Sequence, residues 1–159
     1  MTSIEVHTSG AMRELGRQLA ASLRAGDLVL AVGDLGAGKT TLVQGIGAGL
    51  GVHGDVLSPT FVIARVHRDG RVPLVHVDAY RLESVDEIDD LDLDASLEES
   101  VTVVEWGEGK VERLSTDRLE LRIARGTDPD DETRVVTVAG VGARWRALPR
   151  LTSHEPDER

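Results

Sequence analysis

The sequence has no cysteine and no asparagine, only four aromatic residues, and only two lysines among its eighteen basic residues. Without cysteine the chain can form neither disulfides nor thiolate metal sites, which favours a cytoplasmic location. No apolar run approaches the roughly 20 residues that a membrane-spanning helix needs. The first ten residues, MTSIEVHTSG, also lack the basic and then apolar pattern of a secretory signal. We therefore expect a cytoplasmic protein with no membrane association.

Negative charge dominates the chain, whose formal net charge is −10 at pH 7. Such a surface repels a phosphate backbone unless a local basic stripe offsets it, and the arginines are scattered along the sequence. Four aromatic residues are also too few for a platform on which bases could stack. These absences argue against direct nucleic-acid binding, although an acidic protein can serve a nucleic-acid pathway through protein partners.

The 159 residues, of which 40% are hydrophobic and 29% charged, fit one globular domain of ordinary size. We expect a single domain over residues 1–150 and a disordered tail over 151–159. Apolar runs predict strands at 4–8, 28–32, 61–67, 72–78, 101–106, 118–124 and 133–139. The third and fourth of these strands read as one hairpin, and the last two as another.

Helical spacing of leucines predicts a helix that begins after Ser9, which we take as its N-cap. A second helix is predicted to end near Leu50, where a cluster of glycines follows. A third helical pattern begins with the capping-box pair Ser84 and Glu87. Because a helix and a buried strand come first and hairpins follow, we expect a three-layer α/β fold whose sheet mixes parallel and antiparallel strands.

A glycine-rich loop, GDLGAGKTT, occupies residues 33–41 and matches the Gly-x-x-x-x-Gly-Lys-Thr pattern of a P-loop. Glycines let backbone amides converge on a phosphate, and the start of the following helix adds partial positive charge. Lys39 would reach the β- and γ-phosphates, and the Thr40 hydroxyl would ligate Mg²⁺. The predicted nucleotide-binding loop comprises Gly33, Gly36, Ala37, Gly38, Lys39, Thr40 and Thr41.

The nucleotide is predicted by elimination. Guanine-specific P-loop proteins usually read the base with an Asn-Lys-x-Asp motif, and a chain without asparagine cannot carry one. We therefore expect ATP. Ser9, with its neighbour Thr8 just before the first helix, is our candidate for the adenine end of the site.

Two acidic residues follow buried strands, as a P-loop nucleotidase requires near its Mg²⁺. Asp78 ends the run LVHVD, and Glu105 ends VTVVE. One of them would hold the metal while the other orients water, and the sequence leaves the division open. Thr60 in SPTF lies where switch-like loops occur in P-loop enzymes, although Pro59 is equally consistent with a plain turn.

Between Arg81 and Lys110 lie eleven acidic residues and no basic residue. A calcium loop starting at Asp90 is excluded, because Ala95 and Val101 stand where glycine and glutamate are needed. We interpret 83–99 as a solvated acidic helix and loop, and a protein-docking surface as the second choice. The five histidines show no metal-ligand spacing; His76 alternates with strand residues and is expected to be packed.

These motifs together resemble the TsaE family of small bacterial ATPases, which serve the biosynthesis of threonylcarbamoyladenosine in tRNA. The resemblance rests on GDLGAGKTT, SPTF, HVDAYRL (76–82) and VEW (104–106), which occur in the family's order and spacing. It covers roughly residues 4–140. The P-loop alone is common to many enzymes, whereas the combination of the four motifs is highly specific.

The resemblance implies a P-loop NTPase-type fold, binding of ATP and Mg²⁺, and slow hydrolysis by the isolated protein. By this resemblance, Lys39 and Thr40 hold the phosphates and the metal, and Thr60 belongs to a switch-like segment. The resemblance places Asp78 at the nucleotide, gives the metal to Glu105, and identifies the adjacent tryptophan with that of the family. The family does not attach the threonylcarbamoyl group. It acts on a complex of the transferase TsaD with TsaB, and its ATP cycle is thought to reset that complex.

The sequence alone leaves two other classes of function open. A small-molecule kinase of the shikimate kinase type has a similar size and P-loop. Such kinases usually carry an arginine-bearing lid, whereas the long segment after the first predicted hairpin is acidic here. The other alternative is a nucleotide-dependent binding module without useful turnover.

Overall fold

The computed structural model describes residues 1–34, 36–53, 64–80, 97–109, 111–126, 128 and 130–152. Several predictions from the sequence concern residues outside these ranges. They are the switch-like SPTF with Thr60, the start of the first hairpin at 61–63, the helical pattern at Ser84 and Glu87, most of the acidic segment, and the tail from residue 153.

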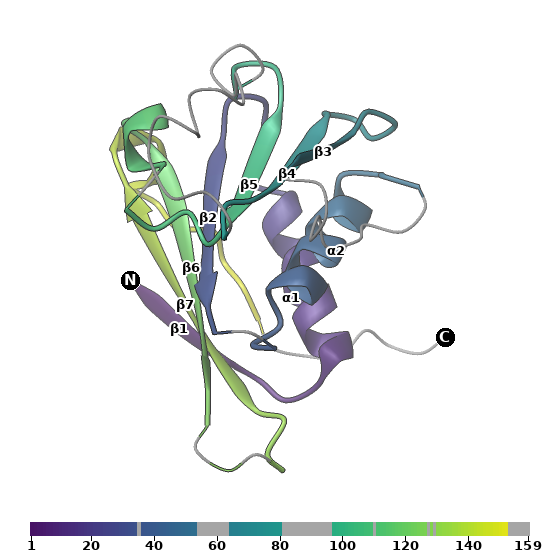
Figure 1. The fold of residues 1–159 in the computed structure, drawn as a ribbon, viewed down its shortest axis with the longest axis vertical. Helices are drawn as coiled ribbons and strands as arrows, with labels where there is room; N and C mark the ends of the chain where they lie inside the picture. The colour runs from purple at the N-terminus through teal and green to yellow at the C-terminus, as the bar shows by residue number, and fades with distance from the viewer. Residues whose placement is uncertain are drawn as a thin grey trace.

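The centre of the fold is a seven-stranded mixed sheet in the order β1-β7-β6-β2-β5-β4-β3 (Figure 1). The four middle strands, β6, β2, β5 and β4, are parallel, and β1, β7 and β3 are added antiparallel. This confirms the predicted α/β fold with a mixed sheet. The strands are β1 (Thr2–Val6), β2 (Leu28–Gly33), β3 (Ala64–His67), β4 (Leu74–Asp78), β5 (Val101–Glu105), β6 (Arg118–Arg125) and β7 (Arg134–Val141).

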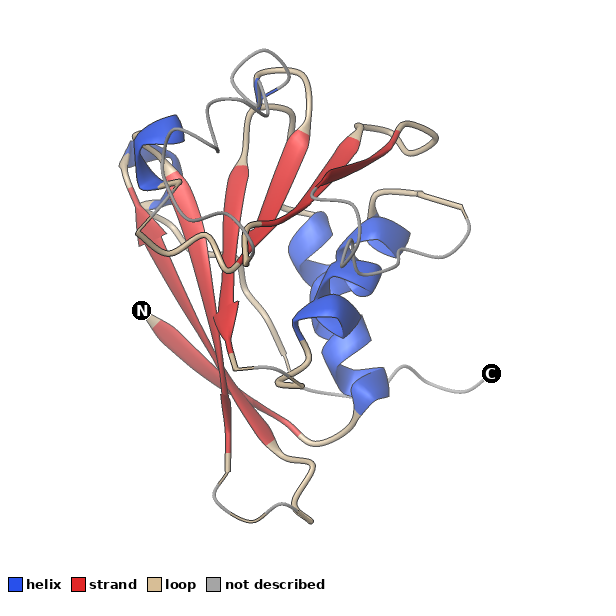
Figure 2. Ribbon diagram, viewed as in Figure 1, coloured by secondary structure: helices blue, strands red, loops and turns tan. Residues whose placement is uncertain are grey.

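Two helices, α1 (Ser9–Ala20) and α2 (Lys39–Gly49), lie together on one face of the sheet (Figures 1 and 2). They cross closely because glycines stand at the contact. A Cβ at Gly45 would lie 2.0 Å from the Arg13 carbonyl oxygen, and one at Gly16 would lie 2.3 Å from the Leu42 carbonyl oxygen. The larger hydrophobic core fills the space between this helix pair and the sheet. The crossing therefore fixes where α2 begins.

The opposite face of the sheet has a smaller apolar cluster. Residues of β2, β4 and β5, such as Leu30, Val77 and Val104, pack there against Leu97 and Val111. The short helix η1 (Glu112–Leu114) follows directly, and a second short helix, η2 (Ala143–Trp145), follows β7. Sheet residues are thus buried on both faces, as parallel strands require.

Both predicted hairpins are present, in β3 with β4 and in β6 with β7. Their boundaries differ from the prediction by a few residues. The N-cap of α1 is Thr8 and not Ser9, so that prediction was wrong. Thr8 has extended backbone angles and its hydroxyl accepts a hydrogen bond from the Ala11 amide at 3.0 Å, which leaves Ser9 as the first helical residue.

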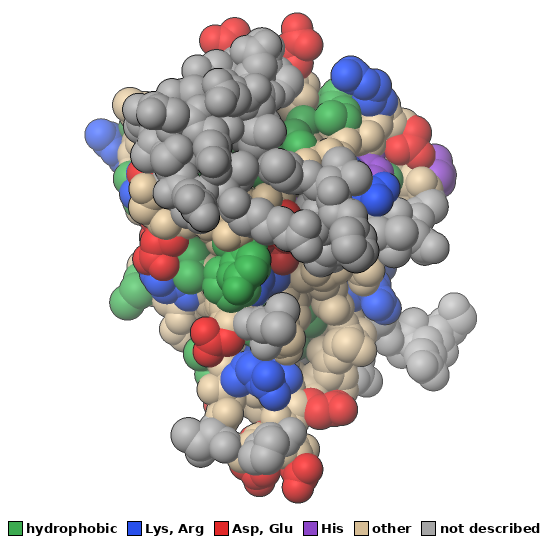
Figure 3. Space-filling view, in the orientation of Figure 1, with side chains coloured by type: hydrophobic (Ala, Val, Ile, Leu, Met, Phe, Trp, Pro, Cys, Tyr) green, Lys and Arg blue, Asp and Glu red, His purple; other side chains and the backbone are tan. Residues whose placement is uncertain are grey.

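Charged side chains of both signs lie in small separate groups on the face drawn in Figure 3. The described part of that face has no continuous basic stripe, in line with the sequence. Among the residues that the structure describes, no helix is long and apolar enough to cross a membrane.

Candidate phosphate-binding site

The glycine-rich loop connects the central strand β2 to the start of α2 at Lys39. Its turns need glycine, because Gly36 has φ +78° and Gly38 has φ +112°. Backbone hydrogen bonds from the Ala37 amide to the Asp34 carbonyl, and from the Leu42 amide to the Gly38 carbonyl, join the loop to the first turn of the helix at 3.0 Å each. Amides at the N-terminus of a helix, together with the helix dipole, attract anions.

Gly33 is required for a different reason, which is contact with the neighbouring strand β6. A Cβ there would lie 2.9 Å from the Ile123 carbonyl oxygen and 3.2 Å from the Ala37 Cβ. The last residue of β2 is therefore closely packed between β6 and its own loop, and a larger side chain would push the loop out of place.

Lys39 bends back over the loop from which it comes. Its Nζ donates hydrogen bonds to the carbonyl oxygens of Gly33 and Asp34. Burial lowers the pKa of the Lys39 ammonium, and the nearby carboxylates of Glu105, Asp34 and Asp78 oppose that shift. An ammonium has three N–H donors, so two are used by the loop itself. The loop thus carries a buried positive charge at the N-terminus of α2.

Trp106 borders this ammonium, and Tyr80 packs against Trp106. The Lys39 Nζ lies 4.0 Å from the centroid of the Trp106 ring, and the Tyr80 ring meets Trp106 edge-on with centroids 5.1 Å apart. Trp106 has φ +60°, an uncommon conformation for a bulky residue. Tyr80 is 66% exposed, which places it at the outer edge of this cluster.

Asp78 and Glu105 end neighbouring parallel strands and are paired in register. Alternation along β4 and β5 directs both side chains to the face that carries α2, since their neighbours Val77 and Val104 belong to the opposite cluster. The structure therefore brings together Lys39 and the two acids that the sequence singled out. Asp78 also accepts a hydrogen bond from the Tyr80 amide at 2.9 Å.

His76 lies two residues before Asp78 and is completely buried, as predicted for a packed residue. Its Nε2 forms a hydrogen bond with Oε2 of Glu105, which is itself only 4% exposed. Sequence reasoning did not connect these two residues, because they are 29 positions apart and only the strand order makes them neighbours.

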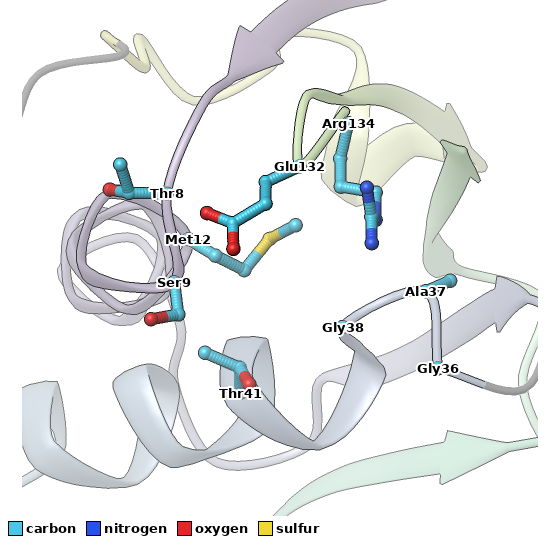
Figure 4. A pocket seen from close by; sticks show the side chains of 9 residues that line it. All are labelled: Thr8, Ser9, Met12, Gly36, Ala37, Gly38, Thr41, Glu132 and Arg134. Carbon is cyan, nitrogen blue, oxygen red and sulfur yellow. The ribbon is translucent and has the colours of Figure 1, made fainter. Parts of the chain in front are cut away.

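A cavity of about 220 Å³ opens beside the loop, between the start of α1 and the start of β7 (Figure 4). Figure 4 shows the Glu132 carboxylate pointing into it and the Arg134 side chain extending toward the loop. It is lined by Thr8, Ser9, Met12, Gly36, Ala37, Gly38, Thr41, Glu132 and Arg134. The sequence pointed to Thr8 and Ser9, but it carried no signal for Glu132 and Arg134, which follow an ordinary polar turn.

The predicted site residues thus fall into two adjoining groups. Lys39, Asp78 and Glu105 gather where the strands end, with the half-buried Thr40 following Lys39 on the first turn of α2. Gly36, Ala37, Gly38, Thr41 and Ser9 line the cavity, and Gly33 supports the loop from β2. Thr60 lies outside the described residues.

The oxygen atoms near Lys39 that could act as metal ligands suit a small hard cation that is held mainly by phosphates and water. Hydroxyl and carboxylate oxygens are the ligands that Mg²⁺ prefers, and it usually takes only one or two carboxylates from the protein. No group of three or more His, Cys, Asp or Glu side chains that could hold a metal occurs among the described residues. Thr40, Asp78 and Glu105 would therefore complete a metal–phosphate complex and not form a separate metal cage.

An α/β domain with a mixed sheet, whose central strand leads through a glycine-rich loop into a helix, has the fold of P-loop NTPases. A crystal structure of YdiB from Bacillus subtilis is similar, with a TM-score of 0.74 and 31% sequence identity, covering 91% of this chain and 88% of that one.

Residues 6–135 match the family model of the threonylcarbamoyl adenosine biosynthesis protein TsaE. The chain is 68% identical over 139 residues to a Streptomyces coelicolor protein, a match that covers 84% of this chain and 93% of the relative. It is 48% identical over 132 residues to a Mycobacterium tuberculosis protein, with 77% of each covered. Both relatives are named tRNA threonylcarbamoyladenosine biosynthesis protein TsaE. This chain belongs to the TsaE family.

Proposed function

We propose that this protein is a Mg²⁺-dependent ATPase that supports the threonylcarbamoyl modification of tRNA adenosine. The observation that carries the proposal is the position of Lys39, at the start of α2 and within the field of the paired strand-end acids Asp78 and Glu105. Membership of the TsaE family gives the pathway.

In this proposal the loop holds the phosphates of ATP. Amides of residues 36–40 surround the phosphate groups, and the dipole of α2 favours their charge. The Lys39 ammonium, already held by two carbonyls of the loop, has a donor left for a phosphate oxygen. A bound anion replaces the hydration that burial has removed from this ammonium, so binding the phosphate stabilises its charged form.

Magnesium supplies charge neutralisation to the phosphates, and Thr40 with Glu105 are the residues proposed to hold it. Asp78 lies beside Glu105 at the end of the next strand and is proposed to contact the nucleotide or to orient water. A carboxylate that orients water increases hydrolysis by placing the nucleophile in line, without itself forming a bond to the substrate.

The cavity lined by Ser9, Thr41 and Arg134 is proposed to receive the base and ribose. It adjoins the phosphate loop through Gly36 and Gly38. Its volume is below the range of roughly 300–1,000 Å³ typical of a complete small-molecule site. It therefore suits one end of a nucleotide whose phosphates lie outside it on the loop.

The partners proposed for this chain are a transferase of the TsaD type and a TsaB-type protein. In this proposal the ATPase does not transfer the threonylcarbamoyl group, and hydrolysis by the isolated protein is slow. Repeated turnover of the modifying complex then depends on hydrolysis, which distinguishes an ATPase from a nucleotide-dependent binding module.

The test uses wild type, Lys39→Ala and Glu105→Gln in a reconstituted modification assay with TsaB, TsaD and tRNA. We expect wild type to sustain many rounds of modification with ATP. Lys39→Ala should bind nucleotide much more weakly. Glu105→Gln should keep nucleotide and partner binding but stop after about one round. Full activity of Glu105→Gln would overturn the need for hydrolysis. If wild type binds neither Mg·ATP nor the partners, the proposal as a whole is overturned.

A further inference from the structure

His76 is a buried polar residue that the proposed reaction does not use directly. Its side chain has no exposed surface, and its Nε2 is hydrogen-bonded to Oε2 of Glu105. Nδ1 of the same ring is buried and has no hydrogen-bond partner among the described residues. A buried polar atom without a partner costs free energy, so the position of this ring requires an explanation.

The surroundings of the two ring nitrogens indicate which of them carries the hydrogen atom. If Nε2 carries the hydrogen, it donates to the Glu105 carboxylate, and Nδ1 is left as an unprotonated acceptor. A proton on Nδ1 would instead leave a buried N–H donor unpaired and would leave Oε2 without a donor. A hydrogen on Nε2 is therefore the arrangement that satisfies this pair best.

The strands fix the direction of this hydrogen bond. His76 lies on β4 and Glu105 on β5, and the register pairs His76 with Val103 and Asp78 with Glu105. The two side chains therefore approach each other along one face of two central strands, where neither backbone can shift freely. The bond uses Oε2 of Glu105 and so fixes the orientation of the whole carboxylate.

We infer that His76 is a positioning residue for Glu105: it holds one carboxylate oxygen by Nε2–H, so that the other faces the nucleotide-bound metal. This inference rests on the proposed function. It assigns the buried ring a role beyond packing, because partners that orient a metal ligand contribute to metal affinity as well as to stability.

The test compares His76→Leu with His76→Gln, whose amide can again donate to Glu105. His67→Leu is the matched control, since His67 lies on the adjacent strand β3 and also has a buried ring nitrogen without a partner among the described residues. The affinity of Mn²⁺ for the complex with a non-hydrolysable ATP analogue is measured by electron paramagnetic resonance. Nucleotide affinity in EDTA and the melting temperature are measured in parallel.

We expect His76→Leu to weaken Mn²⁺ binding by about 10- to 100-fold, the usual effect of removing an outer-shell partner. Nucleotide affinity in EDTA should stay unchanged, His76→Gln should recover most of the Mn²⁺ affinity, and His67→Leu should resemble wild type. In a Glu105→Gln background, His76→Leu should have little further effect on Mn²⁺ binding, because its contribution acts through Glu105.

Mn²⁺ affinity that is unchanged in His76→Leu, or that falls only in parallel with nucleotide affinity in EDTA, would overturn the inference and leave His76 a packing residue. If His76→Leu does not fold, His76→Gln is compared with His76→Met, which has a similar size and no donor: equal Mn²⁺ affinity in the two overturns the inference, and weaker affinity in His76→Met alone supports it. These results leave the proposed function intact. Absence of nucleotide binding by wild type would instead refute the proposed function and the inference together.

Discussion

The ammonium of Lys39 lies over the face of Trp106, with Nζ 4.0 Å from the ring centroid. Lys39 starts the helix that follows the glycine-rich loop, and Trp106 directly follows the strand that ends in Glu105. The contact therefore joins the two halves of the candidate site through a cation–π interaction. Any ligand that engages the ammonium must change the surroundings of the indole.

Trp106 should consequently report nucleotide binding by its fluorescence. We expect its emission to change when Mg·ATP is added, because a phosphate competes for the ammonium above the ring. Trp106→Phe should lose this signal. Trp145→Phe should keep it, since the other tryptophan lies in a different contact, beneath the Arg144 guanidinium. A signal that survives in Trp106→Phe and disappears in Trp145→Phe would show that the response arises elsewhere.

Lys39→Ala should separate nucleotide binding from folding. Loss of a charge-assisted hydrogen bond costs about 1.5–3 kcal/mol, so ATP affinity should fall roughly 10- to 150-fold. The unfolding free energy should change by less than about 1 kcal/mol, because a buried ammonium is itself costly. Titration calorimetry and urea unfolding measure the two effects. Arg13→Ala, which removes the same charge from the exposed side of α1, should alter neither. An equal loss of stability in Lys39→Ala would indicate a structural lysine.

Gly45→Ala should destabilise the protein because it separates α1 from α2. The added Cβ would lie 2.0 Å from the Arg13 carbonyl oxygen, which is backbone and cannot rotate away. We expect a cost of about 1–3 kcal/mol or more in the unfolding free energy. Gly10→Ala is the matched control in α1. A Cβ there meets only the Thr8 hydroxyl at 3.8 Å, so this change should be neutral or stabilising. A neutral Gly45→Ala would mean that the helices do not pack as described.

The Arg144→Ala variant should unfold at a much lower urea concentration than wild type. The guanidinium makes two hydrogen bonds of 3.0 Å to the carboxylate of Asp27, which is 4% exposed. Removing one member of a fully buried pair costs about 3–5 kcal/mol because the other charge stays desolvated. Since the Arg144 side chain is 21% exposed, the cost here should lie at or below the lower end of that range. The double variant Asp27→Ala, Arg144→Ala should cost less than the two single changes added together. Arg17→Ala, which breaks an exposed pair with Glu14, should cost under about 1 kcal/mol. Strict additivity would contradict the coupling.

Stability should decrease at acidic pH partly through Asp69. Its carboxylate accepts a hydrogen bond from the His53 amide at 2.8 Å, and this bond lowers the pKa of Asp69. A lowered folded-state pKa means that the contribution is present above the ordinary value of 3.8 and is lost as pH falls through the folded-state value. Urea unfolding between pH 6 and pH 2 should therefore show wild type and Asp69→Ala converging at low pH. Asp130→Ala, which removes an exposed carboxylate from another turn, is the control for the loss of one surface charge.

Strands and helices of this fold were predictable where the local pattern is strong. The continuous apolar run of β2 and β5 indicates buried parallel strands, and the glycine loop before Lys39 indicates the start of a helix. Pairings between distant strands were not predictable. Nothing in the sequence places β6 beside β2 or β1 beside β7, because strand order depends on packing of the whole chain.

The same distinction applies to the candidate site. Asp78 and Glu105 could be predicted from the sequence because each acid follows a buried run and precedes a loop. The His76–Glu105 bond, the Trp106 contact with Lys39, and the cavity residues Glu132 and Arg134 were not, since they arise only when the strands are placed side by side. The cap at Thr8 was missed by one residue because serine and threonine are both favoured caps, and the adjacent Ser9 is the better of the two by preference.

The position of β2 between β5 and β6 has a consequence for synthesis on the ribosome. The glycine loop is translated early, but both strands that flank β2 are translated much later, β5 at Val101–Glu105 and β6 at Arg118–Arg125. A nascent chain that ends before these strands emerge lacks the carbonyl of Ile123 that rests against Gly33. The glycine loop can therefore reach its final packing between β2 and β6 only after most of the polypeptide has left the exit tunnel.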